Sequence, residues 1–345
     1  MFQRLLTIAS VLLVLQSCKK DDAAAKEPPV VYVVGSEEIA TPSTYSIAKL
    51  WKNGQATNLT TSNNYAEAYA VFVSGSDVYV AGYETQGVNN VAKLWKNGVA
   101  TSITNGTRDA QLGSVFVSGS DVYVSGYESN GNYDAAKIWK NGVATTLAGG
   151  VSTDAYSAGV VVSGADVYAL IQEYGAINGV IKVWKNGTAT TISSANVDAY
   201  ANSIAVSGSD VYVAGSEQVG NTYKPFMWKN GQRIAINTTS GVTYSEAGFI
   251  TVANNDVYII LYESDSNSNE YYRIVKNGTV IATLNGAANT SIEANSLFVS
   301  GNDIYVSGAE NVNGKWSPVY WKNNTIVRLT ASSASNGHAY SIFVK

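Results

Sequence analysis

The chain has 345 residues, of which 46% are hydrophobic and 14% are charged, so it can bury a large core. Its formal net charge is −4 and its longest basic run is Lys19-Lys20, which excludes the basic surface that nucleic-acid-binding proteins present. Glycine is frequent (31), proline is scarce (5) and tyrosine is abundant (23), a composition that favours β-strands joined by turns.

The first 17 residues differ from the rest of the chain. Arg4 supplies a positive charge, and residues 5–15 form an apolar stretch that is short for a span across a bilayer. Leu-Gln-Ser-Cys over residues 15–18 follows and resembles the lipobox of bacterial lipoproteins. The resemblance implies a lipoprotein signal peptide over residues 1–17, lipidation of Cys18 and an anchor in the outer membrane. A plain secretory signal with an incidental cysteine is the alternative.

Residues 18–29 are predicted to form the lipidated cysteine and a flexible tether. Residues 19–22 (Lys-Lys-Asp-Asp) resemble the short charged tag that sends lipoproteins of Bacteroidetes to the cell surface, although an ordinary solvated linker explains the same residues. Because Cys18 is the only cysteine, the chain has no intramolecular disulfide and no zinc cluster of thiolates.

From residue 30 onward a unit of about 45 residues recurs seven times. Each unit contains four short β segments, seen most clearly at 71–73, 78–81, 92–95 and 100–103. The third segment ends in Trp-Lys-Asn-Gly or a degenerate copy of it, and successive copies begin 44 to 47 residues apart. The copies begin at Trp51, Trp95, Trp139, Trp184, Trp228, Val275 and Trp321. Four strands at this period are the signature of propeller blades, and the repeated Trp is predicted to pack between blades.

The turns agree with this architecture. Asn-Gly between two β segments favours a type I′ hairpin, because both central residues need a positive φ. A second turn, Ser-Gly-x-Asp, joins the first two strands of most units, as at residues 74–77. We expect its Asp to cap its own turn; a calcium site is the alternative, but the spacing lacks the clustered oxygens of a calcium loop.

The seventh unit is divided between the two ends of the chain. Residues 341–344 match the first strand of a unit, whereas residues 30–33 match a second strand. Pairing of the two segments would close a ring and remove an open sheet edge. We therefore predict an all-β, seven-bladed propeller of four-stranded antiparallel blades over residues 30–345. This part resembles β-propeller proteins but lacks the signatures of kelch repeats, WD40 repeats and sialidases, so the resemblance implies a fold and not a function.

The two faces of the predicted ring differ. The turns after strands one and three are nearly the same in every unit and form what we call the turn face. The loops after strands two and four differ in every unit and form the variable face. Varied polar and aromatic loops on a uniform scaffold are typical of a binding surface, and simple drift of longer loops is the alternative.

One acidic residue recurs at the end of the second strand in every unit. Seven equivalent carboxylates do not supply the two different environments that acid–base catalysis needs, so we predict a structural ring whose members accept backbone N–H groups. A site for a cation or a basic partner is the alternative. The ring consists of Glu37, Glu84, Glu128, Glu173, Glu217, Glu263 and Glu310.

A second set of polar residues begins the first strands, where the mouth of a central channel is expected. It is asymmetric and concave, which makes it the best candidate for ligand binding. Trp316 lies outside the repeat pattern in a variable loop and is added as a ligand-stacking candidate. The candidates are Glu67, Tyr69, Gln111, Tyr156, Tyr200, Glu246, Glu293, Trp316, His338 and Tyr340. No catalytic residue, metal site or cofactor is predicted, and a single His is more often a hydrogen-bonded surface residue than a base.

We expect a monomeric, lipid-anchored and non-enzymatic binding module that presents the variable face to a glycan or a protein at the cell surface. A glycan-active hydrolase or lyase using Glu67, Glu246 or Glu293 with His338 or a tyrosine is the first alternative. A scaffold subunit of an outer-membrane complex is the second.

Overall fold

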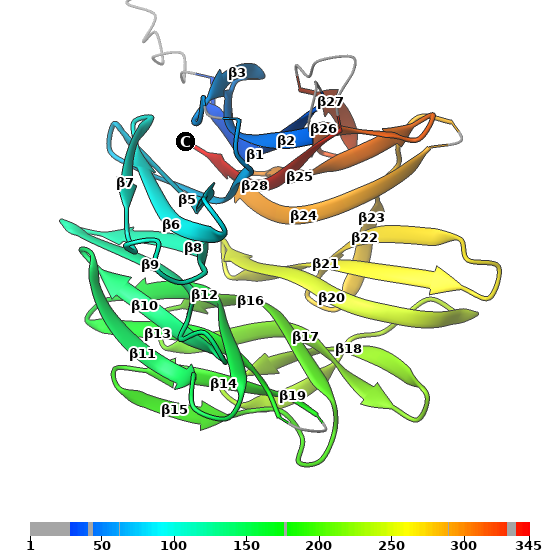
Figure 1. Ribbon diagram of the computed structural model, residues 1–345. Coiled ribbons are helices and arrows are strands. Elements are labelled where there is room, and N and C mark those ends of the chain that lie inside the picture. Colours follow the sequence, from blue (N-terminus) through cyan, green and yellow to red (C-terminus); the bar gives the residue numbers. More distant parts are fainter. Residues whose placement is uncertain (1–27, 41–43, 62, 176–177, 289, 330–335) are drawn as a thin grey trace, which may run out of the picture.

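The computed structural model describes residues 28–40, 44–61, 63–175, 178–288, 290–329 and 336–345. The predicted signal peptide, Cys18 and most of the predicted tether lie outside these residues. The described residues form 28 strands in seven four-stranded antiparallel sheets, which surround a common axis (Figure 1). The prediction of an all-β, seven-bladed propeller is confirmed.

Each blade runs from an innermost strand beside the common axis to an outermost strand at the rim. The first blade contains β28 (Gly337–Val344), β1 (Val31–Ala40), β2 (Thr44–Lys52) and β3 (Gln55–Asn58). The second contains β4 (Ala66–Ser74), β5 (Asp77–Gln86), β6 (Asn89–Lys96) and β7 (Val99–Ser102). The third contains β8 (Ala110–Ser118), β9 (Asp121–Ser129), β10 (Asp134–Lys140) and β11 (Val143–Gly149).

The remaining blades repeat this order. The fourth contains β12 (Asp154–Ser163), β13 (Asp166–Tyr174), β14 (Gly179–Lys185) and β15 (Thr188–Thr191). The fifth contains β16 (Ala199–Ser207), β17 (Asp210–Val219), β18 (Thr222–Lys229) and β19 (Gln232–Ala235). The sixth contains β20 (Val242–Ala253), β21 (Asp256–Asp265), β22 (Glu270–Lys276) and β23 (Thr279–Thr283). The seventh contains β24 (Ser291–Ser300), β25 (Asp303–Val312), β26 (Lys315–Lys322) and β27 (Thr325–Arg328).

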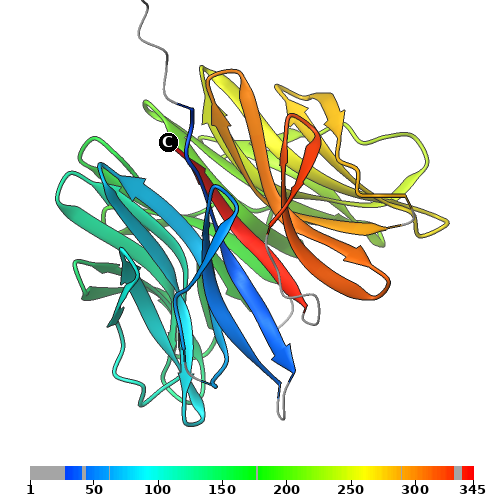
Figure 2. The ribbon, with the colours of Figure 1, turned by 90° about the horizontal axis from the view of Figure 1, so that it is seen from above.

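The ring is closed by strands from the two ends of the chain. β28 pairs with β1 from Val31 opposite Val344 to Glu37 opposite Gly337, and Figure 2 shows the two strands side by side. The backbone N–H groups of Val30 and Lys345 also donate to each other's carbonyl oxygens, at 2.8 and 3.0 Å. The predicted closure is confirmed, and it gives the innermost strand of the first blade a partner along its length.

The turn face is built from one network that recurs from blade to blade. In the second blade both central residues of the hairpin have positive φ, 52° at Asn97 and 83° at Gly98, as a type I′ turn requires. Asp77 was expected to cap its own turn, but its carboxylate instead accepts Nδ2 of Asn97 and Nζ of Lys96, each at 2.8 Å, from the next hairpin. The side chain of Asn97 in turn accepts the N–H of Val78 at 2.8 Å. The Asp–Lys–Asn motif therefore fastens each pair of neighbouring turns.

The repeated tryptophan lies between blades. Trp95, on β6 of the second blade, is fully buried against Val34 of the first blade and Ala68 and Val71 of its own. Trp51, Trp139, Trp228 and Trp321 are buried in the same way. Large rings at equivalent positions fill the space between twisted sheets that smaller side chains would leave open. The core is thus a ring of inter-blade clusters.

Candidate functional site

Every innermost strand carries a β-bulge at the same position. In the second blade Ala68 pairs with Gly82 and Ala70 with Ala81, so Tyr69 between them has no partner on β5. A bulge re-aims the side chain of its extra residue. The bulged residues are Tyr69, Gly113, Ala158, Asn202, Gly248, Asn295 and Tyr340. All of them except Gly248 line the central channel, and the candidates Tyr69 and Tyr340 are members of this set.

The strand opposite the bulge has a glycine at the point of closest approach in five blades. A Cβ on Gly82 would lie 1.9 Å from the carbonyl oxygen of Glu67, a distance that no side chain can occupy. The equivalent glycines are Gly35, Gly126, Gly215 and Gly308. They allow the backbone that bears the candidate residues to approach the second strand closely.

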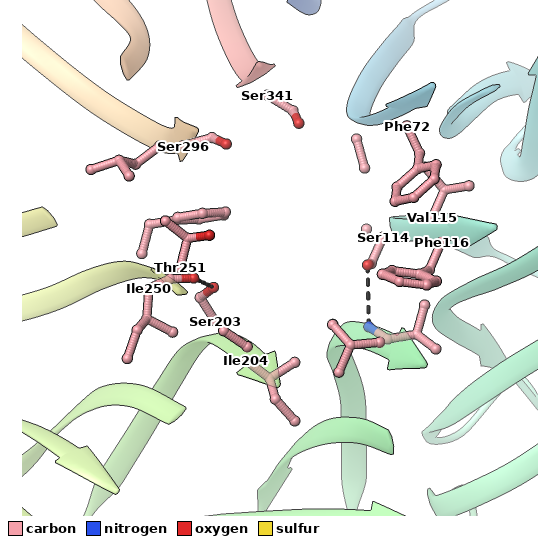
Figure 3. A pocket seen from close by; sticks show the side chains of 18 of the residues that line it. Phe72, Ser114, Val115, Phe116, Ser203, Ile204, Ile250, Thr251, Ser296 and Ser341 are labelled. Carbon is pink, nitrogen blue, oxygen red and sulfur yellow. Dashed lines mark hydrogen bonds between the residues drawn. The ribbon is translucent and has the colours of Figure 1, made fainter. Parts of the chain in front are cut away.

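The channel itself is a cavity of about 420 Å³ with two unlike sides (Figure 3). Four phenylalanine rings follow one another along one side, with centroids 4.7 to 5.2 Å apart. They are Phe298, Phe343, Phe72 and Phe116. The equivalent positions on the other side hold the smaller Val161, Ala205 and Thr251. Ser114 and Ser203 are engaged in inter-blade bonds, to the N–H of Val160 and the carbonyl of Ile250.

Aromatic rings surround the channel mouth on the variable face, and we call them the aromatic belt. The long arc of the belt consists of eight tyrosines whose successive ring centroids are 5.0 to 6.3 Å apart. In order these are Tyr127, Tyr156, Tyr174, Tyr200, Tyr223, Tyr244, Tyr262 and Tyr272. The arc extends from the third blade to the sixth.

The short arc continues the belt over the seventh, first and second blades. Its successive centroids are 5.2 to 6.0 Å apart, and it consists of Trp316, His338, Tyr340, Tyr69 and Tyr83. Nδ1 of His338 lies 3.0 Å from a carboxylate oxygen of Glu293. The hydroxyl of Tyr69 donates to Glu67, and that of Tyr340 lies 3.5 Å from the same carboxylate. Six of the ten candidates therefore form one contact network.

A second cavity of about 550 Å³ lies where the two arcs face each other. Tyr262 and Tyr272 from the end of the long arc and Trp316 from the end of the short arc line it. Glu246, Glu270 and Glu293 supply carboxylates to its wall, and the bulged Asn202 and Asn295 connect it with the channel. We call this space the belt cavity. It brings the candidates Glu246, Glu293 and Trp316 to one place.

The surroundings of several belt tyrosines raise the pKa of the hydroxyl. Burial raises the pKa of Tyr83 to about 12, with the negative charge of Glu67 adding to the effect. Burial likewise raises the pKa of Tyr262 to about 12, where its hydrogen bond to Glu270 contributes. The pKa of Tyr272 also lies above the ordinary range, first through burial and then through Glu293 and Glu270. These hydroxyls are therefore hydrogen-bond donors at neutral pH and not bases.

The remaining candidates lie away from the belt cavity. Tyr156 and Tyr200 belong to the long arc and donate to Asp134 and Asp198, at 2.8 and 3.1 Å. Gln111 pairs in register with Tyr127, and within the described part of the chain its side chain makes no hydrogen bond to another candidate. The binding role of all ten candidates stays a prediction.

Sequence reasoning missed most of the belt. A tyrosine directly precedes the ring glutamate in three blades, at Tyr83, Tyr127 and Tyr262, and this partial repeat was an available signal. Tyr223 and Tyr272 on the third strands and Glu270 at the start of β22 have no such regular spacing. Their approach to the belt depends on loop geometry that the sequence does not specify.

The glutamates of the second strands form a ring of ion pairs. They lie inside their strands, one to three residues before the end rather than at it. In the first four blades and the sixth the partner is a Lys or Arg of the third strand, as in Glu128 with Lys137 at 2.6 Å. In the fifth and seventh blades the third strand has Phe226 or Val319 at that position, and an Arg of the outermost strand replaces the cation. The partners are Lys49, Lys93, Lys137, Lys182, Arg233, Arg273 and Arg328.

Backbone bonds of the predicted kind occur in part of this ring. Glu217, Glu263 and Glu310 accept the N–H groups of Ser194, Thr239 and Ala287 respectively. These donors lie in the segments that lead into each blade, so the carboxylate joins a blade to its entry loop. Among the described residues, no three His, Cys, Asp or Glu side chains are grouped as a metal site would need.

The sequence matches no family model and no curated protein. Among solved structures, the acylaminoacyl peptidase of Pyrococcus horikoshii is 12% identical with a TM-score of 0.53, over 88% of this chain and 50% of that one. A structure from a study of two prolyl endopeptidases is 9% identical with a TM-score of 0.52, over 87% of this chain and 48% of that one. TolB from Acinetobacter baumannii is 13% identical with a TM-score of 0.44, over 71% of this chain and 62% of that one.

This chain spans about half the length of the two peptidases, and at such low identity they support the propeller fold alone. None of the described residues belongs to a helix with the length and apolar composition needed to cross a bilayer.

Proposed function

We propose that the protein is a lipid-anchored glycan-binding module whose variable face meets its ligand outside the outer membrane. The observation that supports the proposal is the aromatic belt with the belt cavity at its gap. Aromatic faces stack on the apolar faces of sugar rings, while tyrosine hydroxyls and carboxylates bond to sugar hydroxyls. A belt of connected rings offers several such positions in a row, which suits an extended chain of sugars. The lipid anchor rests on Cys18 and its lipobox resemblance.

A glycan array probed with the full-length protein in detergent tests this function. Wild-type protein is expected to bind a restricted set of glycans, and W316A and Y272A to lose most of that binding because each removes a wall of the belt cavity. Y133A serves as the control, because Tyr133 is an exposed tyrosine of a variable loop outside the belt. Absence of binding by the wild-type protein, or equal loss in the control, would contradict the proposal.

A glycan-active enzyme is the second candidate, because Glu293 and His338 are hydrogen-bonded beside the belt cavity. It predicts cleavage of an array ligand by wild-type protein and none by E293Q. A scaffold role in an outer-membrane complex predicts instead a stoichiometric partner after gentle detergent extraction. Binding without cleavage and without such a partner favours the binding module.

A further inference from the structure

The belt cavity combines aromatic walls with negative charge. Tyr262, Tyr272 and Trp316 form its aromatic side. The carboxylates of Glu246 and Glu293 lie in the same wall, and Glu270 stands at the exposed start of β22. Other belt carboxylates, such as Glu67, Asp134 and Asp198, also accept tyrosine hydroxyls, but the belt cavity gathers three carboxylates beside three aromatic rings.

Across the described residues, acidic side chains of the scaffold are neutralised by cations. Every ring glutamate has a Lys or Arg partner within 3.6 Å. The six turn-face aspartates have a lysine within 2.9 Å; they are Asp77, Asp121, Asp166, Asp210, Asp256 and Asp303. Most Lys and Arg side chains of the blades therefore form ion pairs with one of these two sets of carboxylates.

The carboxylates of the belt cavity have neutral or titratable partners instead. Glu246 accepts the hydroxyl of Tyr244, and Glu270 accepts that of Tyr262 at 2.8 Å. Glu293 meets Nδ1 of His338. No Lys or Arg among the described residues makes an ion pair with any of the three. The cavity therefore carries negative charge that the protein itself does not neutralise.

The negative charge of the three carboxylates affects the pKa of a tyrosine in the aromatic wall of the cavity. Burial raises the pKa of the Tyr272 hydroxyl, and the charges of Glu293, Glu270 and Glu246 raise it further, so all three carboxylates act on one side of the cavity. They are nevertheless spread around the wall, since the described residues contain no group of three acidic or imidazole side chains placed to hold a metal ion. Dispersed carboxylates next to ring faces match an organic ammonium group, which both charge and cation–π attraction favour.

We propose that the belt cavity binds the protonated amine of an amino sugar that is not N-acetylated. The inference rests on the proposed glycan-binding function and names the sugar class for it. A sugar fits better than a quaternary ammonium ion, because Asn202, Asn295 and the hydroxyls of the wall offer hydrogen bonds that such an ion cannot use. The cavity of about 550 Å³ has room for one or two sugar rings, and the belt continues from it on both sides.

Calorimetric titration of the full-length protein in detergent with two matched ligands tests the proposal. The ligands are a β-1,4-linked glucosamine tetramer with free amines and the same tetramer fully N-acetylated. The free amine is expected to bind about tenfold more tightly, and added salt is expected to reduce this preference. E246Q and E293Q should each reduce the preference, because each removes one negative charge from the wall at nearly constant shape. D121N removes the same charge on the turn face and should leave the preference unchanged.

The outcomes separate the two proposals. Equal affinity for both tetramers, or a preference for the acetylated one, overturns the amine inference while glycan binding stands. A free-amine preference that persists unchanged in both glutamine variants overturns the assignment to this cavity.

Binding of neither tetramer, with selective binding of another glycan on the array, overturns the sugar class alone. Binding of no glycan overturns both proposals, and binding of an oligolysine peptide alone places a basic protein partner in their stead. If a variant fails to fold, the affinities of the wild-type protein for the two tetramers, and their dependence on salt, still test the amine inference.

Discussion

At the scale of single residues, carboxylates in this protein have two kinds of surroundings. Those of the scaffold lie beside Lys or Arg, whereas those of the belt lie beside tyrosine hydroxyls. A neutral phenol that donates to a carboxylate is stabilised in its protonated form, and burial adds to this because the phenolate would be poorly solvated. The belt therefore titrates through its tyrosines at alkaline pH, whereas ion pairs hold the scaffold carboxylates.

Alkaline titration should resolve the belt from the exposed tyrosines. The pKa of Tyr83 and Tyr262 is raised to about 12 from an ordinary value of 10.0. A raised pKa of a folded-state group stabilises the fold fully below the unfolded value, and the contribution is lost as the pH rises through the folded value. We expect phenolate absorbance to appear in two phases, and unfolding free energy to fall between about pH 10 and 12. A single phase near pH 10 with unchanged stability would contradict this.

The ring glutamates should differ in their contribution to stability according to burial. Glu263 is fully buried and accepts the N–H and hydroxyl of Thr239 besides pairing with Arg273. E263Q leaves that cation without its charge partner and is expected to cost about 3 kcal/mol of unfolding free energy. Glu128 and Lys137 are each about a fifth exposed, so E128Q should cost about 1 kcal/mol or less. Urea denaturation of both variants checks the difference, and equal losses would refute it.

At the scale of the strand, the bulge divides each innermost strand into a part that belongs to the scaffold and a part that leads to the belt. Residues on the turn-face side of the bulge follow one pattern in all seven blades, an aliphatic residue, one other residue and then Val, as at Val71 and Val73. Residues on the other side, such as Glu67, vary between blades and reach the belt. An unpaired residue at the same place in seven strands separates these two zones.

The glycine opposite the bulge gives a test of this device. G82A would place a methyl group 1.9 Å from the carbonyl oxygen of Glu67, and relief requires a backbone shift that should cost about 1–3 kcal/mol. G113A is the matched control, because its Cβ would have its nearest neighbour at 3.8 Å. The control is expected to be neutral or to gain up to about 1 kcal/mol. Thermal unfolding of the two variants measures the difference in stability. If G82A is as stable as the wild-type protein, the bulge can relax and the prediction is wrong.

At the scale of the whole molecule, closure by β28 joins the ends of the chain into one ring. The strand buries Ile342 and Val344 against the first and seventh blades, so its removal would expose apolar surface as well as the edge of β1. A chain that ends before residue 337 is expected to self-associate, as measured by light scattering. A peptide of residues 337–345 added in trans should restore the monomer. A truncated chain that stays monomeric without the peptide would contradict a closing role for this strand.

Much of the ring could be predicted from the sequence because its determinants are local and repeated. The Asn-Gly turns, the Trp spacing and the divided seventh unit each specify one feature of the ring. The channel mouth was predicted from position within the repeat, and the structure places Tyr69 and Tyr340 there. Most of the belt was not predicted, because Tyr223 contacts Tyr244 of the next blade, and Tyr272 and Glu270 share a cavity with Trp316 of another blade, through loops of unequal length. Contacts between blades depend on the direction in which each side chain points, and the spacing of the repeats along the sequence does not give that direction.

The closure also places the start of β1 on the turn face, opposite the belt. Val31 donates its N–H to the side chain of Asn53, so the chain enters the ring at the turn face. If Cys18 bears lipid, the anchor would be joined to the turn face by a segment of twelve residues, 18–29, whose fully extended length is at most roughly 40 Å. The uniform turns would then form the side of the molecule that is nearest to the membrane anchor. The belt would then lie on the face opposite the point of attachment, where a polymer outside the membrane could reach it.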